Sequence, residues 1–422
     1  MKAPPLGERI PLWGAFMLIV AAIVVVKVWT LLELDDTALF GAYSVLVSTY
    51  ILSRFLLAAF YEPERLRPSG EGQAFEPAVT IIVPAKNEEE VIGETLRRCL
   101  QADYPPHQLQ VIAVNDGSTD RTLTEMRRVE EEYPQLTIVD LPVSQGKRRA
   151  MAEGVRRARG EVLVFIDSDS LIEPGSLRKL VAYFADPTVG AVTGHADVYN
   201  KHTNLLTRMQ AVRYYIAFRV YKAAEALYGS VTCCSGCFSA YRRRAVEEVL
   251  EPWLDQTFLG VECTYGDDRS LTNYLLPNWR LLYAPEAQAY TVVPDTWSKF
   301  LRQQLRWKKS WVRESLRAAA FMWRKPPVMA LSFYIGALLP LLAPLIVLRA
   351  VVVRPLLAGV PPYWYLGGVL VMAFLYGLYY RIHKRESLWV YGTLFALFYT
   401  AVLVWQMPYA ILTMQNNSWG TR

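Results

Sequence analysis

Residues 161–169 read Glu-Val-Leu-Val-Phe-Ile-Asp-Ser-Asp, an apolar run that ends in two acids. A short apolar run bounded by polar residues is typical of a strand that is buried on both faces of a sheet. Similar runs occur upstream, and segments with helical character alternate with them. This alternation predicts an α/β domain built on a parallel sheet with helices on both faces. The other expected strands are 79–83, 109–114 and 136–139, and the expected helices are 88–100, from 121 onward, and 146–158.

Polar side chains gather where these strands end. In open sheets of this kind, ligands bind beyond the carboxyl ends of the strands. Because parallel strands end at the same edge, we expect the residues at those ends to lie close together. These residues are Pro84, Ala85, Asn87, Glu88, Asp116, Asp167 and Asp169.

The acids Asp167 and Asp169 suit a metal and nucleotide site. Two carboxylates two positions apart on a strand-end turn can reach one divalent cation and a ribose or phosphate, as Mg²⁺ and Mn²⁺ prefer. The alternative is a solvated turn, and the position at a strand end favours the metal. Asp116 can accept a hydrogen bond from a uracil ring NH, or it can form an Asx turn before a helix.

A basic segment opens the helix expected at 146–158. Lys147 and Arg148 follow a loop that ends in Gly146. Positive charge at a helix start is unfavourable against the helix dipole, so an exposed basic helix start explains the segment poorly. Backbone NH groups together with these two side chains would suit a diphosphate.

Asp267 and Asp268 are the candidate catalytic acids. Transfer of a sugar with inversion needs a carboxylate that takes the proton of the acceptor hydroxyl, and one acid of the pair can serve while the other supports it. The alternative is a helix N-terminus, where acids belong, because an apolar segment follows the pair. The residues alone leave the two interpretations even.

Gln303, Arg306 and Trp307 lie on neighbouring faces of a basic, aromatic segment at 297–325. Such a segment is typical of an amphipathic helix at a membrane interface. Arg306 can stabilise a leaving diphosphate, and an indole face can stack on a sugar. An ordinary interfacial helix explains the arginine and the tryptophan, but not the other candidate site residues that occur with them in this sequence.

Long apolar runs flank the central segment of this 422-residue chain, which is 53% hydrophobic. Each is long enough to cross the hydrocarbon core, which needs about 20 residues. We expect two N-terminal spans in 1–61, a catalytic domain in 75–296, the interface helix in 297–325 and a membrane region in 326–422. The five apolar runs are 11–33, 38–61, 328–353, 362–380 and 387–413.

The net charge is +6, and much of the positive charge lies between Lys299 and Lys325, next to the third apolar run. Basic residues beside spans mark the cytoplasmic side, which predicts a multi-pass protein of the cell membrane with a cytoplasmic catalytic domain. A basic patch can also bind nucleic acid. Tryptophans interleaved with the basic residues favour the lipid surface, so no nucleic-acid partner is expected.

Taken together, these blocks resemble the hyaluronan synthases, which are processive family-2 glycosyltransferases. The resemblance covers most of 79–315. It implies a GT-A fold, that is, a Rossmann-like α/β domain inserted between transmembrane helices. It also implies UDP-GlcNAc and UDP-glucuronate as substrates, Mg²⁺ or Mn²⁺ as cofactor, and a growing polysaccharide that leaves through the enzyme's own channel. The matching blocks are 114–118, 167–170, 233–236 with 239–243, 256–260, 266–273, 303–307 and the terminal 419–422.

The resemblance also implies a role for each matching residue. Asp116 would bind uracil, Lys147 and Asp167 the nucleotide, Asp169 the metal, and Asp268 would be the base. Ser235 and Gly236 would border the acceptor sugar, while Gln303, Arg306 and Trp307 would form the wall beside the diphosphate and acceptor. Trp419 and Arg422 belong to a C-terminal motif that the family keeps near the cytoplasmic site.

Three features depart from the family pattern. Lys86 stands where an aromatic residue often stacks on uracil, and Cys237-Phe238 replaces a usual Pro-Leu beside the acceptor. Five spans would put Trp419 outside the cell, so one run should be re-entrant, and 328–353, with its two prolines, is the candidate. Two rival functions remain open: a chitin or chito-oligosaccharide synthase that uses UDP-GlcNAc alone, and a single-transfer lipid glycosyltransferase.

Overall fold

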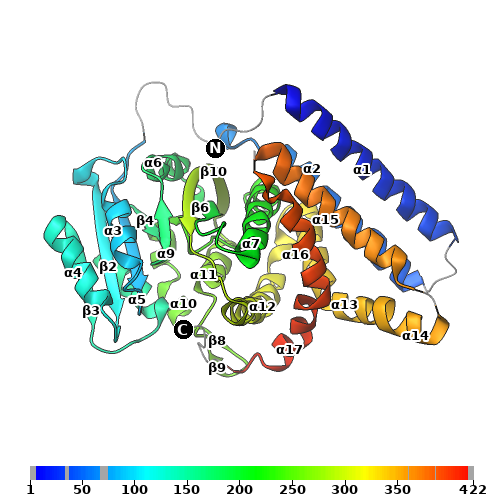
Figure 1. Cartoon of the computed structure of the whole chain (residues 1–422). Coiled ribbons are helices and arrows are strands. Elements are labelled where there is room, and N and C mark those ends of the chain that lie inside the picture. Colours follow the sequence, from blue (N-terminus) through cyan, green and yellow to red (C-terminus); the bar gives the residue numbers. More distant parts are fainter. Residues whose placement is uncertain (1–5, 34–37, 67–74, 360, 385, 417–422) are drawn as a thin grey trace.

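The computed structural model describes residues 6–33, 38–66, 75–359, 361–384 and 386–416. A sheet domain occupies one half of the molecule and long apolar helices the other (Figure 1). The main sheet has the strand order β3-β2-β1-β4-β7-β6-β10-β5. Its strands are β1 Val79–Ala85, β2 Leu109–Asp116, β3 Leu136–Leu141, β4 Val162–Phe165, β5 Ser170–Ile172, β6 Val189–Val198, β7 Ser239–Arg242 and β10 Arg280–Thr291, and β8 Thr257–Phe258 pairs with β9 Val261–Glu262 in a separate hairpin.

The first half of the sheet confirms the alternating pattern. Strands β3, β2, β1 and β4 are parallel neighbours, with Val79 opposite both Leu109 and Val162. Every residue of β1 is buried, as expected for a strand covered on both faces. The helices between these strands are α3 Ile92–Leu100, α4 Thr122–Glu132 and α5 Lys147–Arg157.

The second half of the sheet corrects the expectation of a wholly parallel sheet. Strand β7 runs antiparallel between β4 and β6, and β5 runs antiparallel beside β10, while β10 and β6 are parallel. The remaining helices of this domain are α6 Ser176–Val181, α7 Leu205–Ile216, α8 Ala223–Ala226, α9 Arg243–Glu247, α10 Leu250–Leu254 and α11 Asp267–Leu275.

Helix α3 begins four residues later than the sequence predicts. Asn87 has a positive φ of 55°, a conformation that asparagine tolerates better than most residues. The backbone NH of Asn87 donates to Ser118 Oγ at 3.0 Å, and the Glu88 NH donates to Thr122 Oγ1 at 2.7 Å. These bonds tie the end of β1 to the loop after β2, so the helix starts only beyond them.

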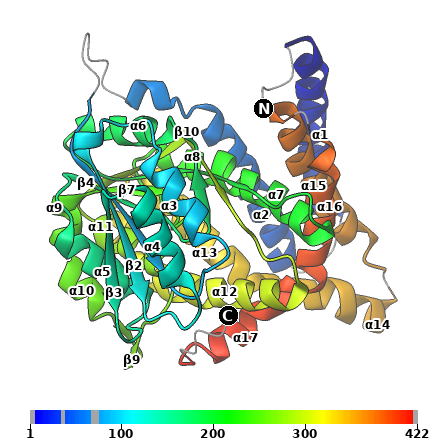
Figure 2. The same cartoon turned by 60° about the vertical axis from the view of Figure 1, so that its left-hand side comes forward.

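The basic segment forms a single long helix, α12 Trp297–Ala319, as predicted. It crosses between the sheet domain and the apolar helices (Figure 2). Lys308 Nζ donates to Gln406 Oε1 of α17 at 3.1 Å, so the last helix packs along it. The helices outside the sheet domain are α1 Leu6–Glu33, α2 Ala38–Ala59, α13 Pro327–Leu348, α14 Arg354–Ala358, α15 Tyr363–His383, α16 Val390–Ala401 and α17 Gln406–Leu412.

By length and apolar composition, three helical stretches of the described chain could cross a membrane: Phe40–Ala59, Pro327–Ala358 and Tyr365–His383. The apolar part of α1, Ile10–Val25, is shorter. The expectation that 328–353 is re-entrant is wrong, because that stretch continues without a sharp break. The bend, of 43°, instead separates Ser387–Ala401 from Leu403–Leu412, a broken span or a re-entrant loop.

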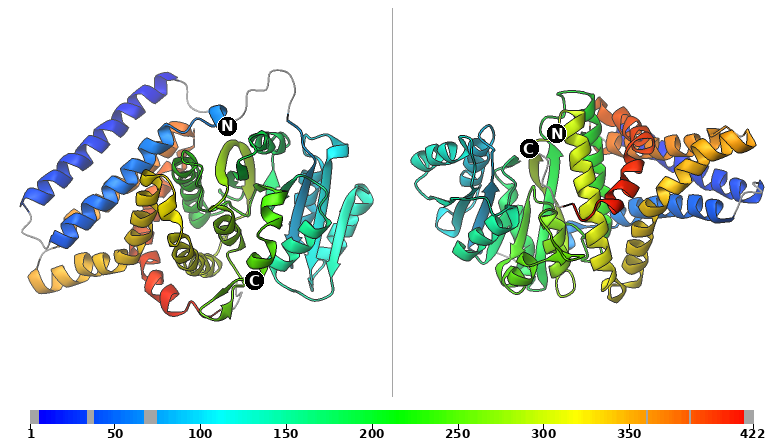
Figure 3. Two further views of the ribbon diagram at one scale, coloured as in Figure 1. Left: turned by 180° about the vertical axis from the view of Figure 1, so that it is seen from behind. Right: turned by 90° about the horizontal axis from the view of Figure 1, so that it is seen from below.

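Two ion pairs join the end of α15 to the sheet domain. Lys384 Nζ lies 2.8 Å from Asp197 Oδ2 in β6, and Lys201 Nζ lies 2.7 Å from Glu386 Oε1. Views from behind and from below show the apolar helices projecting from one side of the sheet domain (Figure 3). The sheet domain therefore contacts the same end of α15 that the basic residues mark.

Candidate active site

The loop that opens α5 is held by Asp116. This buried carboxylate accepts hydrogen bonds from Ser144 Oγ at 2.8 Å and from the backbone NH groups of Gln145 at 2.7 Å and Gly146 at 3.0 Å. Lys86 Nζ in turn donates to Ser144 Oγ at 2.9 Å. Asp116, at the end of β2, thus fixes the loop that precedes α5, and Lys86, which follows β1, contacts the same loop. Pro84 and Ala85 end β1 beside it, and both are buried.

Lys147 and Arg148 reach two acidic segments that are far apart in sequence. Lys147 forms an ion pair with Asp167, at the end of β4. Arg148 Nε lies 2.9 Å from Asp267 Oδ1, at the start of α11, and both side chains are almost fully buried. Arg148 also donates to the backbone carbonyl of Trp253 at 2.9 Å. Consecutive residues therefore bring the acids of β4 and α11 to one place, as the sequence analysis requires.

The pKa of Lys147 reflects the acids that surround it. Burial works against its charged form, but Asp167, and then Asp267 and Asp268, together raise the pKa of Lys147 above its ordinary value. Lys147 therefore carries a positive charge at every physiological pH. Arg148 is largely withdrawn from solvent by its pairing with Asp267, so of the two basic side chains Lys147 is the one placed to meet a phosphate.

Asp167 and Asp169 fit a divalent cation. Burial, and then the charge of Asp167, raise the pKa of Asp169 to about 7, although Lys147 opposes this shift. Two carboxylates in one partly buried turn repel each other, and a cation relieves that repulsion. The described residues contain no cluster of three acidic, histidine or cysteine side chains that could hold a metal alone. A cation here would therefore complete its shell with phosphate oxygens and water, as Mg²⁺ usually does.

The loop at 233–236 links the two acidic segments. The Asp167 backbone NH donates to the Gly236 carbonyl at 3.0 Å. Cys233 Sγ lies 3.7 Å from Asp268 Oδ2. Burial and the charge of Asp268 raise the pKa of Cys233 to about 11, so the thiol keeps its proton and can donate it to that carboxylate. Ser235 is fixed in the loop, since its NH donates to Thr193 Oγ1 at 3.2 Å.

Gly236→Ala should reduce activity at least about tenfold, in the range that a misplaced catalytic group causes. A Cβ at Gly236 would lie 2.8 Å from Asp167 Oδ1, so the carboxylate must move and its ion pair with Lys147 must change. Initial rates and melting temperature measure the effect. Gly175→Ala is the matched control, because a Cβ there meets nothing within 4 Å. Equal rates for both variants would contradict this role of Gly236.

The two acids of α11 have different surroundings. Gly266 precedes the helix with a φ of 81°, and Asp267 and Asp268 form its first turn. Acids in the first turn stabilise a helix, so the expected alternative, that this pair begins a helix, is correct. Asp267 is buried against Arg148, whereas Asp268 is half-buried and accepts hydrogen bonds from the Arg269 NH at 2.8 Å and from the Cys233 thiol at 3.7 Å. The site interpretation therefore applies to Asp268.

Arg306 of α12 lies near the acids of β4 and α11. Burial lowers the pKa of Arg306, while Asp268, Asp267 and Asp167 act in the opposite direction. The Trp307 ring lies 6.3 Å from the ring of Tyr214 on α7, measured between centroids, and the Arg213 guanidinium carbon lies 5.7 Å from the Trp307 centroid. Among the described residues, Gln303 Oε1 is buried with no hydrogen-bond partner.

Several residues of this region carry no sequence signal of their own. Tyr214 and Arg213 contact Trp307 from α7, and nothing in the sequence pattern singles them out. Cys233 belongs to the matching block 233–236, but its contact with Asp268 is visible only in the structure. Trp419 and Arg422 lie outside the described residues. The last described residues lie beside α12: Lys309 Nζ donates to the Asn416 carbonyl at 3.5 Å.

Known proteins are similar to this chain over most of its length. A family described as "Glycosyltransferase like family 2" matches residues 77–310. A hyaluronan synthase of Streptococcus pyogenes is 31% identical over 418 residues, which cover 98% of each protein. An N-acetylglucosaminyltransferase of Rhizobium meliloti (strain 1021) is 30% identical over 405 residues, 93% of this chain and 92% of that protein.

Among solved structures, a mannosyltransferase of Pyrobaculum calidifontis in complex with GDP-Man and Mn²⁺ shares the fold. Its TM-score is 0.53 at 22% identity, and the match covers 90% of this chain and 100% of the other. At that identity the likeness shows the fold alone.

Proposed function

The chain belongs to glycosyltransferase family 2 and has the GT-A fold, and on that premise we propose that it is a membrane-embedded, processive hyaluronan synthase. It would polymerise UDP-GlcNAc and UDP-glucuronate and translocate the product. The observation that carries the proposal is the pairing of Lys147 with Asp167 and of Arg148 with Asp267. It brings a nucleotide-binding turn and a candidate base together in a chain whose whole length matches a hyaluronan synthase.

On the donor side, the charges suit a sugar nucleotide. Asp116 organises the loop that would face uracil, and Lys86 lies beside it in place of an aromatic ring. Lys147 would neutralise the diphosphate, with Arg306 from α12 on the other side. A divalent cation held by Asp169 and Asp167 would supply further positive charge for the leaving UDP.

On the acceptor side, Asp268 is the proposed general base. The acceptor hydroxyl oxygen attacks the anomeric carbon, the bond from that carbon to the UDP oxygen breaks, and the hydroxyl proton passes to Asp268. Attack from the face opposite UDP inverts the configuration. Ser235 and Gly236 would border the acceptor sugar, and Trp307, held by Tyr214, would stack on it.

The membrane arrangement supports release across a bilayer. The sheet domain contacts α12 and the end of α15, both rich in basic residues, and this supports a position on the cytoplasmic side. Helix α17 packs along α12, and Asn416 contacts Lys309. If the bent pair α16–α17 is a re-entrant loop, the C-terminus lies on the cytoplasmic side, as the sequence comparison with the family requires. We keep the domain limits 1–61, 75–296, 297–325 and 326–422 as part of this proposal.

A second candidate is an oligosaccharide synthase that uses UDP-GlcNAc alone. The observation that favours it is the 30% identity to a rhizobial N-acetylglucosaminyltransferase over 93% of this chain. Purified protein in lipid discs, supplied with labelled UDP-GlcNAc with and without UDP-glucuronate, separates the two. We expect long polymer only with both donors, and digestion of that polymer by a hyaluronan-specific lyase. Polymer from UDP-GlcNAc alone would support the second candidate.

Removal of divalent metal should stop synthesis. Without a cation, the like charges of Asp167 and Asp169 would repel each other and the donor diphosphate, and Lys147 and Arg306 would be its only counter-charges. We expect EDTA to reduce the rate at least about a hundredfold, in line with the several kcal/mol a metal supplies, and excess Mg²⁺ or Mn²⁺ to restore it. Release of UDP measures the rate. Full activity in EDTA would contradict the metal role.

A further inference from the structure

Helices α11 and α12 meet next to the proposed base. Gly266, which precedes Asp267, lies so close to α12 that a Cβ there would collide with Ser310 Oγ. Along α12, Arg306, Ser310, Arg313 and Glu314 follow one another at helical spacing, so they share one face. The face that carries Arg306 is therefore the face that docks on the helix that carries Asp268.

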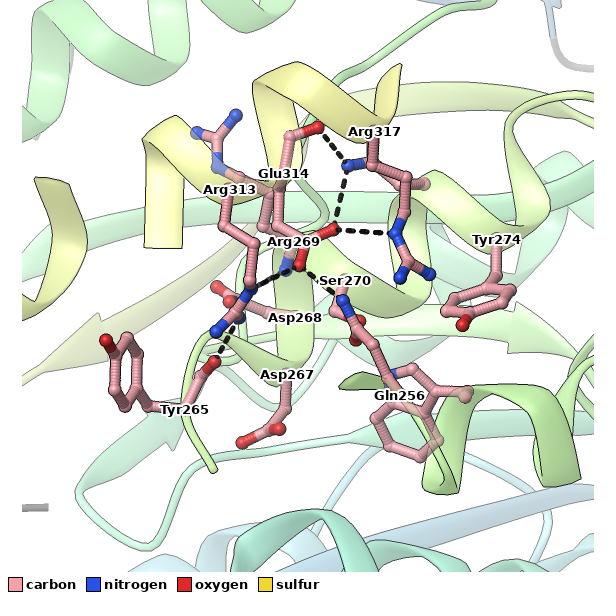
Figure 4. A network of polar contacts seen from close by, with 12 residues as sticks. Gln256, Tyr265, Asp267, Asp268, Arg269, Ser270, Tyr274, Arg313, Glu314 and Arg317 are labelled. Atoms are coloured by element: carbon pink, nitrogen blue, oxygen red, sulfur yellow. Dashed lines mark hydrogen bonds and ion pairs between the residues drawn. The ribbon is translucent and has the colours of Figure 1, made fainter. Parts of the chain in front are cut away.

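A buried carboxylate fills this joint. Glu314 is fully buried, and its Oε1 accepts hydrogen bonds from Gln256 Nε2 at 2.7 Å and from Arg313 Nε at 2.8 Å (Figure 4). Asn273 of α11 donates to Glu314 Oε2 at 3.2 Å and to the Glu314 backbone carbonyl at 2.9 Å. The carboxylate thus binds α11 directly.

Two further contacts complete the joint. Gln256 accepts a hydrogen bond from Ser270 Oγ of α11, so it bridges α11 and α12 through its amide. Arg313 Nη2 donates to the backbone carbonyl of Tyr265, one residue before Gly266, at 2.5 Å (Figure 4). Every group aimed at the Glu314 carboxylate is a donor, so the side chain must act as an acceptor on both oxygens.

We propose that Glu314 and Gln256 are positioning residues that set the location of Arg306 relative to Asp268. This inference rests on the proposed function and deepens it, since neither residue touches substrate. A fixed joint keeps the positive charge of Arg306 where the leaving diphosphate develops negative charge, and such preorganisation is worth more than the same charge on a mobile helix. Shifts of about 1 Å at such a site cost about a hundredfold in rate.

The test is Glu314→Gln, which keeps the size of the side chain but turns an acceptor into a donor. We expect kcat to fall about 10- to 100-fold, with KM for the sugar nucleotides and UDP affinity within about twofold of the parent. The same change made in an Arg306→Lys background should have little further effect, because both changes remove the same contribution.

The swap Gln256→Glu with Glu314→Gln provides the rescue. The amide nitrogen at 314 then donates to the carboxylate at 256, whose second oxygen still accepts from Ser270, while the amide oxygen at 314 still accepts from Asn273. Only the hydrogen bond from Arg313 Nε loses its acceptor. We expect most of the lost kcat to return. Glu386→Gln is the matched control: Glu386 is a buried, ion-paired carboxylate remote from this joint. It should match Glu314→Gln in any loss of stability, but not in kcat.

The outcomes separate the two proposals. An inactive parent protein would remove the proposed function. An active parent whose Glu314→Gln variant keeps its kcat would overturn the positioning role. So would a loss of activity that only tracks the folded fraction, or one that is fully additive with Arg306→Lys, because both indicate packing alone.

Discussion

We expect Asp268→Asn to lower the rate of sugar transfer by about 10²- to 10⁴-fold, the contribution typical of a general base. The reason is chemical: an amide cannot take the proton of the acceptor hydroxyl. The fold should not change, since Asp268 is half-buried, and the hydrogen bond from the Arg269 NH to Oδ1 survives with an asparagine oxygen. Asp267 cannot take over, because Arg148 holds it in a buried ion pair.

UDP release and polymer yield measure this change. UDP binding, followed by calorimetry, should stay within about twofold of the parent, because catalysis and ground-state binding separate when only the base is lost. Asp255→Asn is the control, an exposed acid at the end of α10. If Asp268→Asn keeps its rate, the base lies elsewhere; if it loses UDP binding as well, the site has been disturbed as a whole.

Asp267→Ala destabilises the protein by about 3–5 kcal/mol, the cost of leaving one member of a buried ion pair unpaired. Asp267 and Arg148 retain only 5% and 7% of their side-chain exposure. Arg148 would keep its bond to the Trp253 carbonyl but lose its counter-charge. Because the pair joins α5 to α11, activity should fall together with stability.

Unfolding by heat or urea in detergent micelles measures the loss. The double change Arg148→Met with Asp267→Leu should be less destabilising than Asp267→Ala alone, since it leaves no buried charge behind. Glu94→Ala is the control: Glu94 pairs with Arg98 at 2.8 Å on the surface, and such exposed pairs contribute at most about 1 kcal/mol. Equal losses for Asp267→Ala and Glu94→Ala would contradict a structural role for the buried pair.

Local patterns carried much of what the sequence predicts. The largely apolar runs of β1, β2 and β4 are short and end in polar residues, so buried parallel strands and an acidic edge follow from the residue pattern. The sequence likewise predicts that Gln303, Arg306 and Trp307 lie on one amphipathic helix, and α12 confirms the helix. The apolar runs from 38 onward are recognisable by their length, and the described structure has three helical stretches long and apolar enough to span a bilayer.

Other features had no local signal. Strands β6, β7 and β10 take their directions from which neighbour they pair with, and residues far apart in sequence decide that pairing. The two prolines in 328–353 favoured a break there, but that stretch is continuous, because neighbouring helices can satisfy the backbone groups that a proline frees. The bend of 43° lies instead after Ala401.

The sequence by itself determined that acids lie at strand ends, that a second acid pair begins a helix and that a basic aromatic helix follows. Only the tertiary structure decided which of those acids is free to act. Asp267 and Asp268 are adjacent and chemically identical, and the difference between them arises because Arg148, 119 residues earlier in the chain, is buried against one and not the other. The same holds for Glu314: nothing in the residues next to it in sequence marks it as a positioning residue. Its hydrogen-bond partners come together only when α11 and α12 pack against each other.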